Sequence, residues 1–410
     1  MNSTIELLAP RYDIAWYPWA VQYFFMIAVS YASLWLAAPA LVFGKKAWLP
    51  TARLALIACV STTLVAPVAL LADLHQPLRF WHFYAYANSH SWMSIGSVVL
   101  PLYLVSVLGL AWLAWRPALQ AQRSAPGLSG MLATWLSLGS GITPRALVAV
   151  VGLAALGLSS GIMLYTGAEL AIVKARPLWN TVWLPPMLAT TGFIAASGLV
   201  LVLNRVSGLC SQTAIRQMLY VLLVTCALAG LVAISWFLDG VNAHVGSVAA
   251  ALESVRHSDS WRNTALWGGI TGLALFAAVL LLLTRPTLRQ PGVRGAPTSS
   301  QPALFAWAWL LGLVAIHMGW MFRWVVLMDV QHVARNSAGF HHYGIPAGSS
   351  GILGIVGTFG LWLAAILLIE LFIPWRQAQQ GGLIATPTHA TQDASSTHSL
   401  TAKKGASSHV

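Results

Sequence analysis

Acidic residues are scarce in this sequence, with only 10 aspartates and glutamates among 410 residues. All charged residues together make up 8% of the chain, whereas hydrophobic residues make up 58%. A soluble protein keeps far more charge on its surface, so this composition excludes a soluble globular fold. The chain also has just three cysteines, Cys59, Cys210 and Cys226, which lie far apart in the sequence. Their spacing excludes a disulfide framework and a cysteine-ligated iron–sulfur cluster or zinc site in this chain.

Long apolar runs fill most of the sequence. About 20 apolar residues form a helix that spans the hydrocarbon layer of a bilayer, and we predict nine such spans. They are residues 19–43, 52–71, 92–115, 145–165, 182–203, 218–238, 266–283, 303–325 and 352–372. The expected fold is therefore an all-α, polytopic helical membrane bundle over residues 1–375. The polar residues 376–410 have no apolar periodicity, and we expect a disordered cytoplasmic tail there.

The net charge of +12 is distributed as in a membrane protein rather than in a nucleic-acid-binding protein. Four alternate connections contain basic residues and no acid, and the basic residues at these positions are Lys45, Lys46, Arg53, Arg116, Arg123, Arg145, Arg205, Arg216, Arg285, Arg289 and Arg294. Basic connections stay on the cytoplasmic side of a membrane. The pattern predicts that the N-terminus lies outside, that the tail lies inside, and that the partner is the lipid bilayer and no nucleic acid.

The turn after the second predicted span is unusually polar for this chain. Between Ala72 and Trp92 it contains Asp73, Arg79 and three histidines, His75, His82 and His90, among several aromatic residues. Any one of these histidines alone is more often a solvated side chain. Their crowding on the predicted outer face favours a functional surface.

A single histidine, His317, lies deep within a predicted span. A haem held by two histidines needs a facing pair at one depth, so we expect no haem in this chain. An ionisable residue at mid-membrane is by default a functional candidate. A hydrogen bond to a neighbouring helix would also satisfy His317, and the sequence leaves the two alternatives open.

Other polar residues lie near the predicted outer ends of the spans. Gln22 is about one turn into the first span, where its amide needs a partner inside the protein; a helix-to-helix hydrogen bond and a ligand contact are equally good explanations. Tyr165 and Glu169 are four residues apart and share one helical face. A tyrosine there is often an interfacial anchor. Together with Asp73 and His75, these residues are also candidates for one outward-facing pocket.

Two further features suggest structural roles. Gly351, Gly354, Gly357 and Gly360 recur every three residues, and small residues at such spacing favour close packing of helices. Arg323 lies near the outer end of its span, where we expect its long side chain to reach the membrane interface.

Several stretches resemble the polysulfide reductase/NrfD family of quinone-reactive membrane subunits, and are most similar to the membrane subunits of tetrathionate reductases. They are Pro18 to Phe25, Ala72 to Gln76, Trp81 to Ala85, Ser91 to Met93, Tyr165 to Gly167 with Glu169, Ala175 to Pro177 with Trp179, and Gly357 to Trp362. The family turn usually reads Leu-Asp-Leu-Gly-Arg-Pro, whereas this chain has Ala-Asp-Leu-His-Gln-Pro at residues 72–77. No arginine of this chain stands at that position, so the role of the family arginine is assigned to no residue here.

The resemblance implies a membrane anchor that passes two electrons from quinol, expected to be menaquinol, to an iron–sulfur subunit with ferredoxin-like clusters. A molybdopterin catalytic subunit would then reduce the terminal acceptor in anaerobic respiration. The expected location is the bacterial inner membrane, with the quinol site toward the periplasmic face.

In this interpretation Tyr165, Gln22 and Arg79 hold the quinol, and His75, Asp73 and Glu169 accept its protons. The stretch from Arg79 to Trp92 is the expected docking surface for the iron–sulfur subunit. Two other classes of function stay open. A secondary transporter would need a midplane coupling site, for which the sequence has few candidates, and a passive anchor would have no quinone chemistry.

Overall fold

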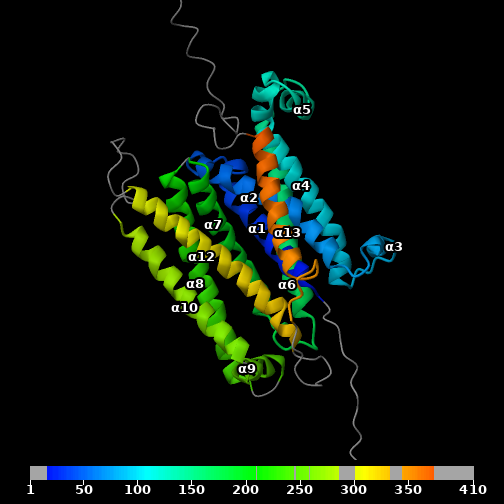
Figure 1. Cartoon of the computed structure of the whole chain (residues 1–410), viewed down its shortest axis with the longest axis vertical. Coiled ribbons are helices and arrows are strands. Elements are labelled where there is room, and N and C mark those ends of the chain that lie inside the picture. The colour runs from blue at the N-terminus through cyan, green and yellow to red at the C-terminus, as the bar shows by residue number, and fades with distance from the viewer. Residues whose placement is uncertain are drawn as a thin grey trace, which may run out of the picture.

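The computed structural model describes residues 16–208, 210–243, 246–257, 259–285, 301–332 and 344–373. Within these ranges all regular secondary structure is helical, and nine helices are long and apolar enough to cross a membrane (Figure 1). They are α1 (Pro18–Leu41), α2 (Leu49–Asp73), α4 (Trp92–Ala121), α6 (Arg145–Ala171), α7 (Leu184–Val206), α8 (Gln212–Asn242), α10 (Asp259–Leu283), α12 (Gln301–Leu327) and α13 (Ile352–Phe372). The predicted all-α membrane fold with nine spans is confirmed. The predicted tail at 376–410 lies outside the described residues, as do His244, His341 and His342.

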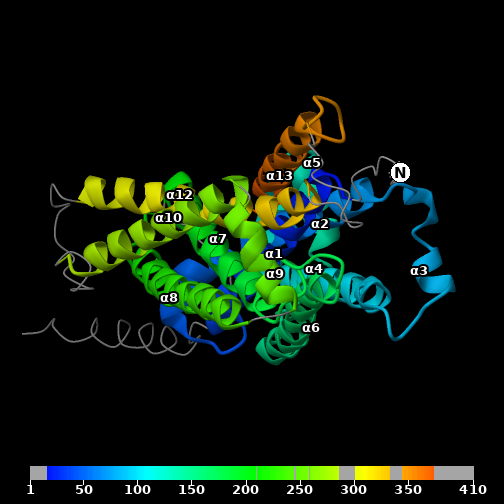
Figure 2. The same cartoon turned by 90° about the horizontal axis from the view of Figure 1, so that it is seen from below.

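Shorter helices lie in the connections between the spans. They are η1 (Lys46–Trp48), η2 (Pro77–Arg79), α3 (His82–Ala85), η3 (Gln122–Ser124), α5 (Leu128–Leu136), α9 (Ser247–His257) and η4 (Asp329–His332). Seen from below, α3 stands at the edge of the bundle, away from α8, α10 and α12 (Figure 2).

Eight of the spanning helices described here pack in two groups of four. In the first group α1 packs on α2, and α4 packs on α6. In the second, α7 packs on α8 and α12, and α10 lies against the same two helices. Because α1 also contacts α7 and α12, it joins the two groups, and α13 lies against α2 and α1.

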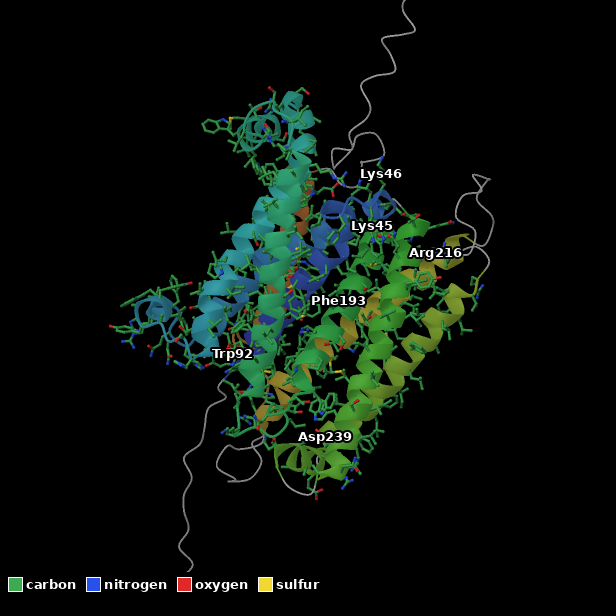
Figure 3. All side chains as sticks on the ribbon, turned by 180° about the vertical axis from the view of Figure 1, so that it is seen from behind. Lys45, Lys46, Trp92, Phe193, Arg216 and Asp239 are labelled. Carbon is green, nitrogen blue, oxygen red and sulfur yellow. The ribbon has the colours of Figure 1, made fainter. Side chains whose placement is uncertain are left out.

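The two ends of the bundle differ in charge. Figure 3 shows Lys45, Lys46 and Arg216 at one end, and Trp92 and Asp239 at the other. We call the first the Lys45 end. The second is the Asp73 end, because α2 ends there at Asp73 and α1 begins beside it. The Asp73 end is the end that the charge pattern predicts to face outward.

α1 is buried on nearly all sides by its neighbours. A helix that is apolar all round is typical of the interior of a large bundle. Its few polar side chains must find partners within the protein, since lipid offers none. Ser30 does so, because its Oγ lies 2.5 Å from Thr63 Oγ1 of α2 and 2.6 Å from Tyr103 Oη of α4. This buried cluster sets the relative rotation of three helices.

Arg323 of α12 is 1% exposed and points into the bundle. Its Nε donates to the Phe24 carbonyl of α1 at 2.9 Å, and its Nη2 donates to the Leu188 carbonyl of α7 at 2.9 Å. Its Nη1 donates to the Gly319 carbonyl at 2.8 Å and to Thr191 Oγ1 at 3.3 Å. The expectation that Arg323 reaches the membrane interface is therefore wrong. The N–H groups of its planar guanidinium thus donate to backbone carbonyls on three helices at once.

The backbones of α7 and α12 approach closely where the two helices cross at Gly198 and Gly312. A Cβ added at Gly198 would lie 2.5 Å from the Gly312 carbonyl oxygen, and a Cβ at Gly312 would lie 2.7 Å from the Gly198 carbonyl oxygen. The predicted packing stripe on α13 is only partly correct. Gly354 packs against the Trp19 ring, but a Cβ at Gly357 or Gly360 would meet no described atom within 4 Å.

The substitution Arg323→Lys tests the role of the buried guanidinium group. Lysine keeps the charge but cannot reach acceptors on three helices, and each orphaned buried carbonyl costs about 1–3 kcal/mol. We expect an earlier apparent midpoint of thermal unfolding, measured by labelling of the buried thiols Cys59 and Cys226 with a thiol-reactive dye during heating. Arg285→Lys, at an exposed position of the Lys45 end, is the matched control. Identical labelling curves for both variants would contradict this role.

Candidate functional site

The end of α2 is tied to the start of α1. The Tyr17 backbone N–H donates to Asp73 Oδ1 at 2.9 Å. Tyr17 is the N-cap of α1 and its side chain makes no capping bond, so Asp73 places a carboxylate at the N-terminus of α1 from another helix. The first N–H groups of a helix have no partner within it, and a negative charge is favourable there.

His75 lies beside this contact. Its Nδ1 is 3.3 Å from Tyr17 Oη, and the two rings are 4.8 Å apart between centroids. Asp73 is half-buried whereas His75 is exposed, and the charges of the two side chains interact. The structure thus brings together the two residues that the sequence placed in one site, with a carboxylate on the inner side and an imidazole at the surface.

Tyr165 and Glu169 lie on one face of α6, as their spacing predicts. Tyr165 is 6% exposed and interacts electrostatically with both Glu169 and Tyr23 of α1. Glu169 is half-buried and also interacts with the charge of Asp73. These four side chains form what we call the carboxyl–tyrosine cluster: Tyr23, Asp73, Tyr165 and Glu169.

Tyr23 is the member that the sequence did not identify. It is 1% exposed, and its buried Oη interacts with the Tyr165 hydroxyl but makes no well-formed hydrogen bond with any described residue. A buried tyrosine hydroxyl normally has a partner. The sequence contained a signal that could have identified Tyr23. It follows Gln22 in an otherwise apolar run, and both polar side chains need hydrogen-bond partners inside the protein. The Tyr23 hydroxyl therefore has room for a further hydrogen bond.

A glycine of α4 makes room for the Tyr165 ring. A Cβ added at Gly96 would lie 2.3 Å from ring carbons of Tyr165. Such a distance does not occur between real atoms, so any side chain at Gly96 would displace the ring. The position of Tyr165 therefore depends on the absence of a side chain on a neighbouring helix.

Gln22 points to a different neighbour than the sequence suggested. It is fully buried, and its Oε1 accepts from Trp320 Nε1 of α12 at 3.3 Å. Its Nε2 is buried without a partner in the described part of the chain. Successive residues of a helix point about 100° apart, so Tyr23 faces α6 while Gln22 faces α12. The structure does not give Gln22 a contact with Tyr165.

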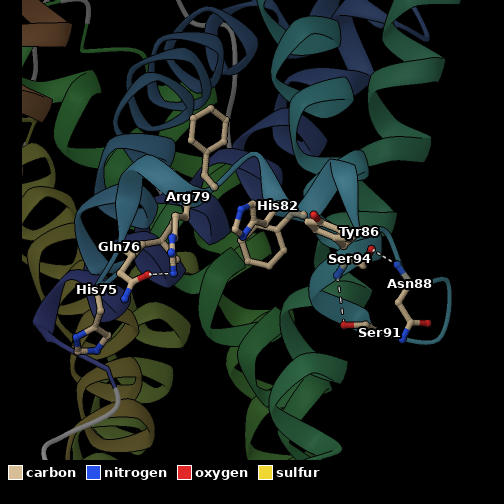
Figure 4. A pocket seen from close by; sticks show the side chains of 11 residues that line it. His75, Gln76, Arg79, His82, Tyr86, Asn88, Ser91 and Ser94 are labelled. Carbon is tan, nitrogen blue, oxygen red and sulfur yellow. Dashed lines mark hydrogen bonds between the residues drawn. The ribbon is translucent and has the colours of Figure 1, made fainter.

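Arg79 also lies apart from the carboxyl–tyrosine cluster. It ends η2, where its Nη1 donates to Gln76 Oε1 at 2.8 Å, and it lines a surface cavity together with His75 and His82 (Figure 4). The sequence placed Arg79 in the same site as Tyr165, but the lining of this cavity includes neither Tyr165 nor Glu169.

Two motif residues of the α6–α7 connection hold the Asp73 end together. Arg176 Nη1 donates to the Val330 carbonyl at 2.5 Å, and Trp179 Nε1 donates to the Val326 carbonyl at 2.6 Å. The Trp179 ring also lies 5.5 Å from the Trp16 ring. These residues connect the start of α1 with the end of α12, so their role is structural. His317, which the sequence left open, is exposed on the surface of α12.

The sequence matches the family described as polysulphide reductase, NrfD, over residues 6–334. The chain therefore belongs to the NrfD family, as its motifs predicted. It is 33% identical to a tetrathionate reductase subunit of Salmonella typhimurium over 369 residues, which cover 89% of this chain and 94% of that protein. It is 22% identical to a selenate reductase subunit of Mesobacillus selenatarsenatis over 284 residues, which cover 65% of this chain and 66% of that protein. It is a multi-pass membrane protein homologous to these two reductase subunits.

The contact between Asp73 and Tyr17 leads to a prediction about the start of α1. Asp73→Ala removes the carboxylate that accepts from the Tyr17 N–H, and loss of a charge-assisted hydrogen bond costs about 1.5–3 kcal/mol. We expect faster hydrogen–deuterium exchange in the peptide that contains Tyr17, measured by mass spectrometry on the purified chain. Asp73→Asn keeps an acceptor oxygen and should exchange more slowly than Asp73→Ala.

The control for this measurement is Asp259→Ala, which removes an exposed carboxylate that pairs with Arg262 at the same end of the bundle. Unchanged exchange at Tyr17 in Asp73→Ala would show that the carboxylate does not hold the start of α1.

Proposed function

We propose that this chain is the membrane anchor and quinol-oxidising subunit of a molybdopterin oxidoreductase complex. Membership of the NrfD family and the relationship to subunits of two reductases support a role in such a complex. The observation that carries the quinol assignment is the carboxyl–tyrosine cluster, which joins two buried tyrosine hydroxyls, one of them without a well-formed hydrogen bond, to two carboxyl groups at one end of the bundle. By analogy with the more similar relative, the complex reduces tetrathionate.

The cluster fits the chemistry of quinol oxidation. Oxidation of one quinol releases two electrons and two protons, so the site needs hydrogen-bonding groups for the two oxygens and acceptors for the protons. Tyr165 and Tyr23 would hydrogen-bond a quinol oxygen, and Glu169 would accept a proton as the electrons leave. The aromatic and aliphatic surroundings suit an apolar ring with a few polar atoms.

The second proton would pass to Asp73 and then to the surface. Asp73 interacts with Glu169 on its inner side and with His75 on its outer side. This order from a half-buried carboxyl to an exposed imidazole leads away from the cluster to water. Proton release would then occur at the Asp73 end, which we place on the periplasmic face of the inner membrane.

The two electrons would leave the chain for an iron–sulfur subunit with ferredoxin-like clusters. The described residues contain no group of three or more histidine, cysteine or acidic side chains that could hold a metal ion. A quinol, expected to be menaquinol, is an organic two-electron donor and needs no metal in this subunit. The partner clusters would take the electrons on to the molybdopterin subunit.

Single substitutions in the cluster test this assignment. In the purified complex with its partner subunits, we expect Glu169→Gln to lower the rate of quinol-driven acceptor reduction about a hundredfold, since a positioned general base contributes at least that much. Tyr165→Phe and Tyr23→Phe each remove one hydrogen bond and should lower kcat/KM for quinol about tenfold. Tyr220→Phe, at an exposed position of α8, is the matched control.

A second electron donor distinguishes quinol chemistry from passive anchoring. A reduced viologen dye donates directly to the partner subunits, so its rate should stay unchanged in all four variants. If the cluster only anchors the partners, Tyr165→Phe would reduce the yield of assembled complex and leave quinol turnover per complex normal. That result would overturn the quinol assignment.

The close packing of the Tyr165 ring against Gly96 leads to an independent prediction. Gly96→Ala places a methyl group 2.3 Å from the ring, which must move, and displacement of a positioning group by about 1 Å can lower a rate a hundredfold. We expect loss of quinol-driven turnover in a complex that still assembles. Gly109→Ala lies on the same helix with nothing within 4 Å of the added methyl. Equal activity of the two variants would show that the Tyr165 position is not critical.

A further inference from the structure

A cavity of about 530 Å³ lies under the connection between α2 and α4. It is separate from the carboxyl–tyrosine cluster and shares only His75 with the proton route proposed above. Its lining residues come from the end of α2, from η2 and α3, and from the start of α4 (Figure 4): Leu74, His75, Gln76, Arg79, Phe80, His82, Phe83, Tyr86, Asn88, Ser91 and Ser94.

The residues that line the cavity are basic or neutral, as expected of a site that binds an anion. They include Arg79 and the two histidines His75 and His82, and none of the lining residues is acidic. One Arg79 nitrogen donates to Gln76 Oε1 at 2.8 Å, while its other donors have no partner among the described residues. Figure 4 shows the Arg79 side chain between Gln76 and His82, both of which line the cavity. A guanidinium with free donors on one side matches the paired oxygens of a phosphate.

The connection that forms the cavity has the exposed apolar surface of a segment that rests in the membrane interface. Leu78 is 89% exposed and Tyr86 is 75% exposed, and Phe80 and Trp81 are each about half exposed. Large apolar and aromatic side chains at the end of a span are typical of the headgroup layer. α3 is held at this level because Tyr84 Oη donates to the Ser97 carbonyl of α4 at 3.0 Å. A cavity at this end of the spans would lie near the level of the lipid phosphates.

We propose that this cavity binds the phosphate group of a membrane phospholipid, with Arg79 as the main ligand and His82 beside it. The aromatic walls and the volume suit a headgroup with the start of its acyl chains rather than a free phosphate ion. The amides of Gln76 and Asn88 offer further hydrogen bonds to a glycerol headgroup. The bound lipid would fill the space between the connection and the bundle and hold α3 in place.

Lipid binding to the purified full-length chain tests this proposal. The probes are phosphatidylglycerol, diacylglycerol with the same acyl chains, and inorganic phosphate, and binding is measured by native mass spectrometry in detergent. We expect phosphatidylglycerol to bind at least about tenfold more tightly than diacylglycerol, since only the phosphate can accept charge-assisted hydrogen bonds from Arg79. Arg79→Gln should remove most of this difference.

Lys174→Gln is the matched control. Lys174 is exposed in the α6–α7 connection at the same end of the bundle, but it does not line the cavity. Its substitution should leave the preference for phosphatidylglycerol unchanged. His82→Gln, a second lining substitution, should weaken the preference less than Arg79→Gln, and its fold is checked by the thermal midpoint of the chain.

Four results would overturn the proposal. Equal binding of phosphatidylglycerol and diacylglycerol would exclude phosphate recognition, and equal effects of Arg79→Gln and Lys174→Gln would indicate diffuse attraction by surface charge. Displacement of the lipid by inorganic phosphate at similar concentrations would assign the site to a soluble anion. If Arg79→Gln instead releases the iron–sulfur subunit from the complex and leaves lipid binding intact, the cavity is a protein docking site.

Discussion

The absence of water within a bilayer is the constraint on which the rest of this structure depends, because every polar group in the membrane must find its partner inside the protein. Arg323 shows this most clearly. It is buried between α1, α7 and α12, and it donates to backbone carbonyls of all three helices. The two groups of four helices are thereby joined by one side chain whose charge would otherwise be costly in the membrane. The hydroxyl cluster around Ser30 does the same for α1, α2 and α4 with neutral groups.

Two buried polar atoms of α1 depart from this rule, and their positions separate structural regions from the candidate site. Gln22 Nε2 has no hydrogen-bond partner among the described residues, and Tyr23 Oη makes no well-formed hydrogen bond there although it interacts with Tyr165. Tyr23 lies beside Tyr165 and Glu169, so an oxygen of a bound ligand would satisfy it. Gln22 keeps one bond to Trp320 and faces the second group of helices. A site that leaves a hydrogen-bonding group unmet when empty binds more tightly the ligand that completes it.

The Asp73 end combines three neighbouring features in a small region. Asp73 holds the start of α1, the other members of the carboxyl–tyrosine cluster lie on its inner side, and the cavity under the α2–α4 connection lies on its outer side. His75 is shared, because it contacts Tyr17 and also lines the cavity. A lipid bound in the cavity would thus lie next to the route by which we propose that protons leave. The arrangement explains why the most polar turn of the sequence connects these two spans.

The sequence by itself determined the fold class, the nine spans and the family, because composition, run length and motifs are local properties of the chain. It also selected Asp73, His75, Tyr165 and Glu169 as candidates, which the structure places near one another, since polar residues at the ends of apolar runs are conspicuous. It did not reveal the role of Tyr23, it misplaced Arg323, and it grouped Gln22 and Arg79 with Tyr165. Each of these depends on how a helix is rotated about its axis and which neighbour it meets. A helix that is apolar on all sides has no polar face from which its rotation could be predicted. The rotation of α1 was therefore decided only by its tertiary packing against α6, α7 and α12.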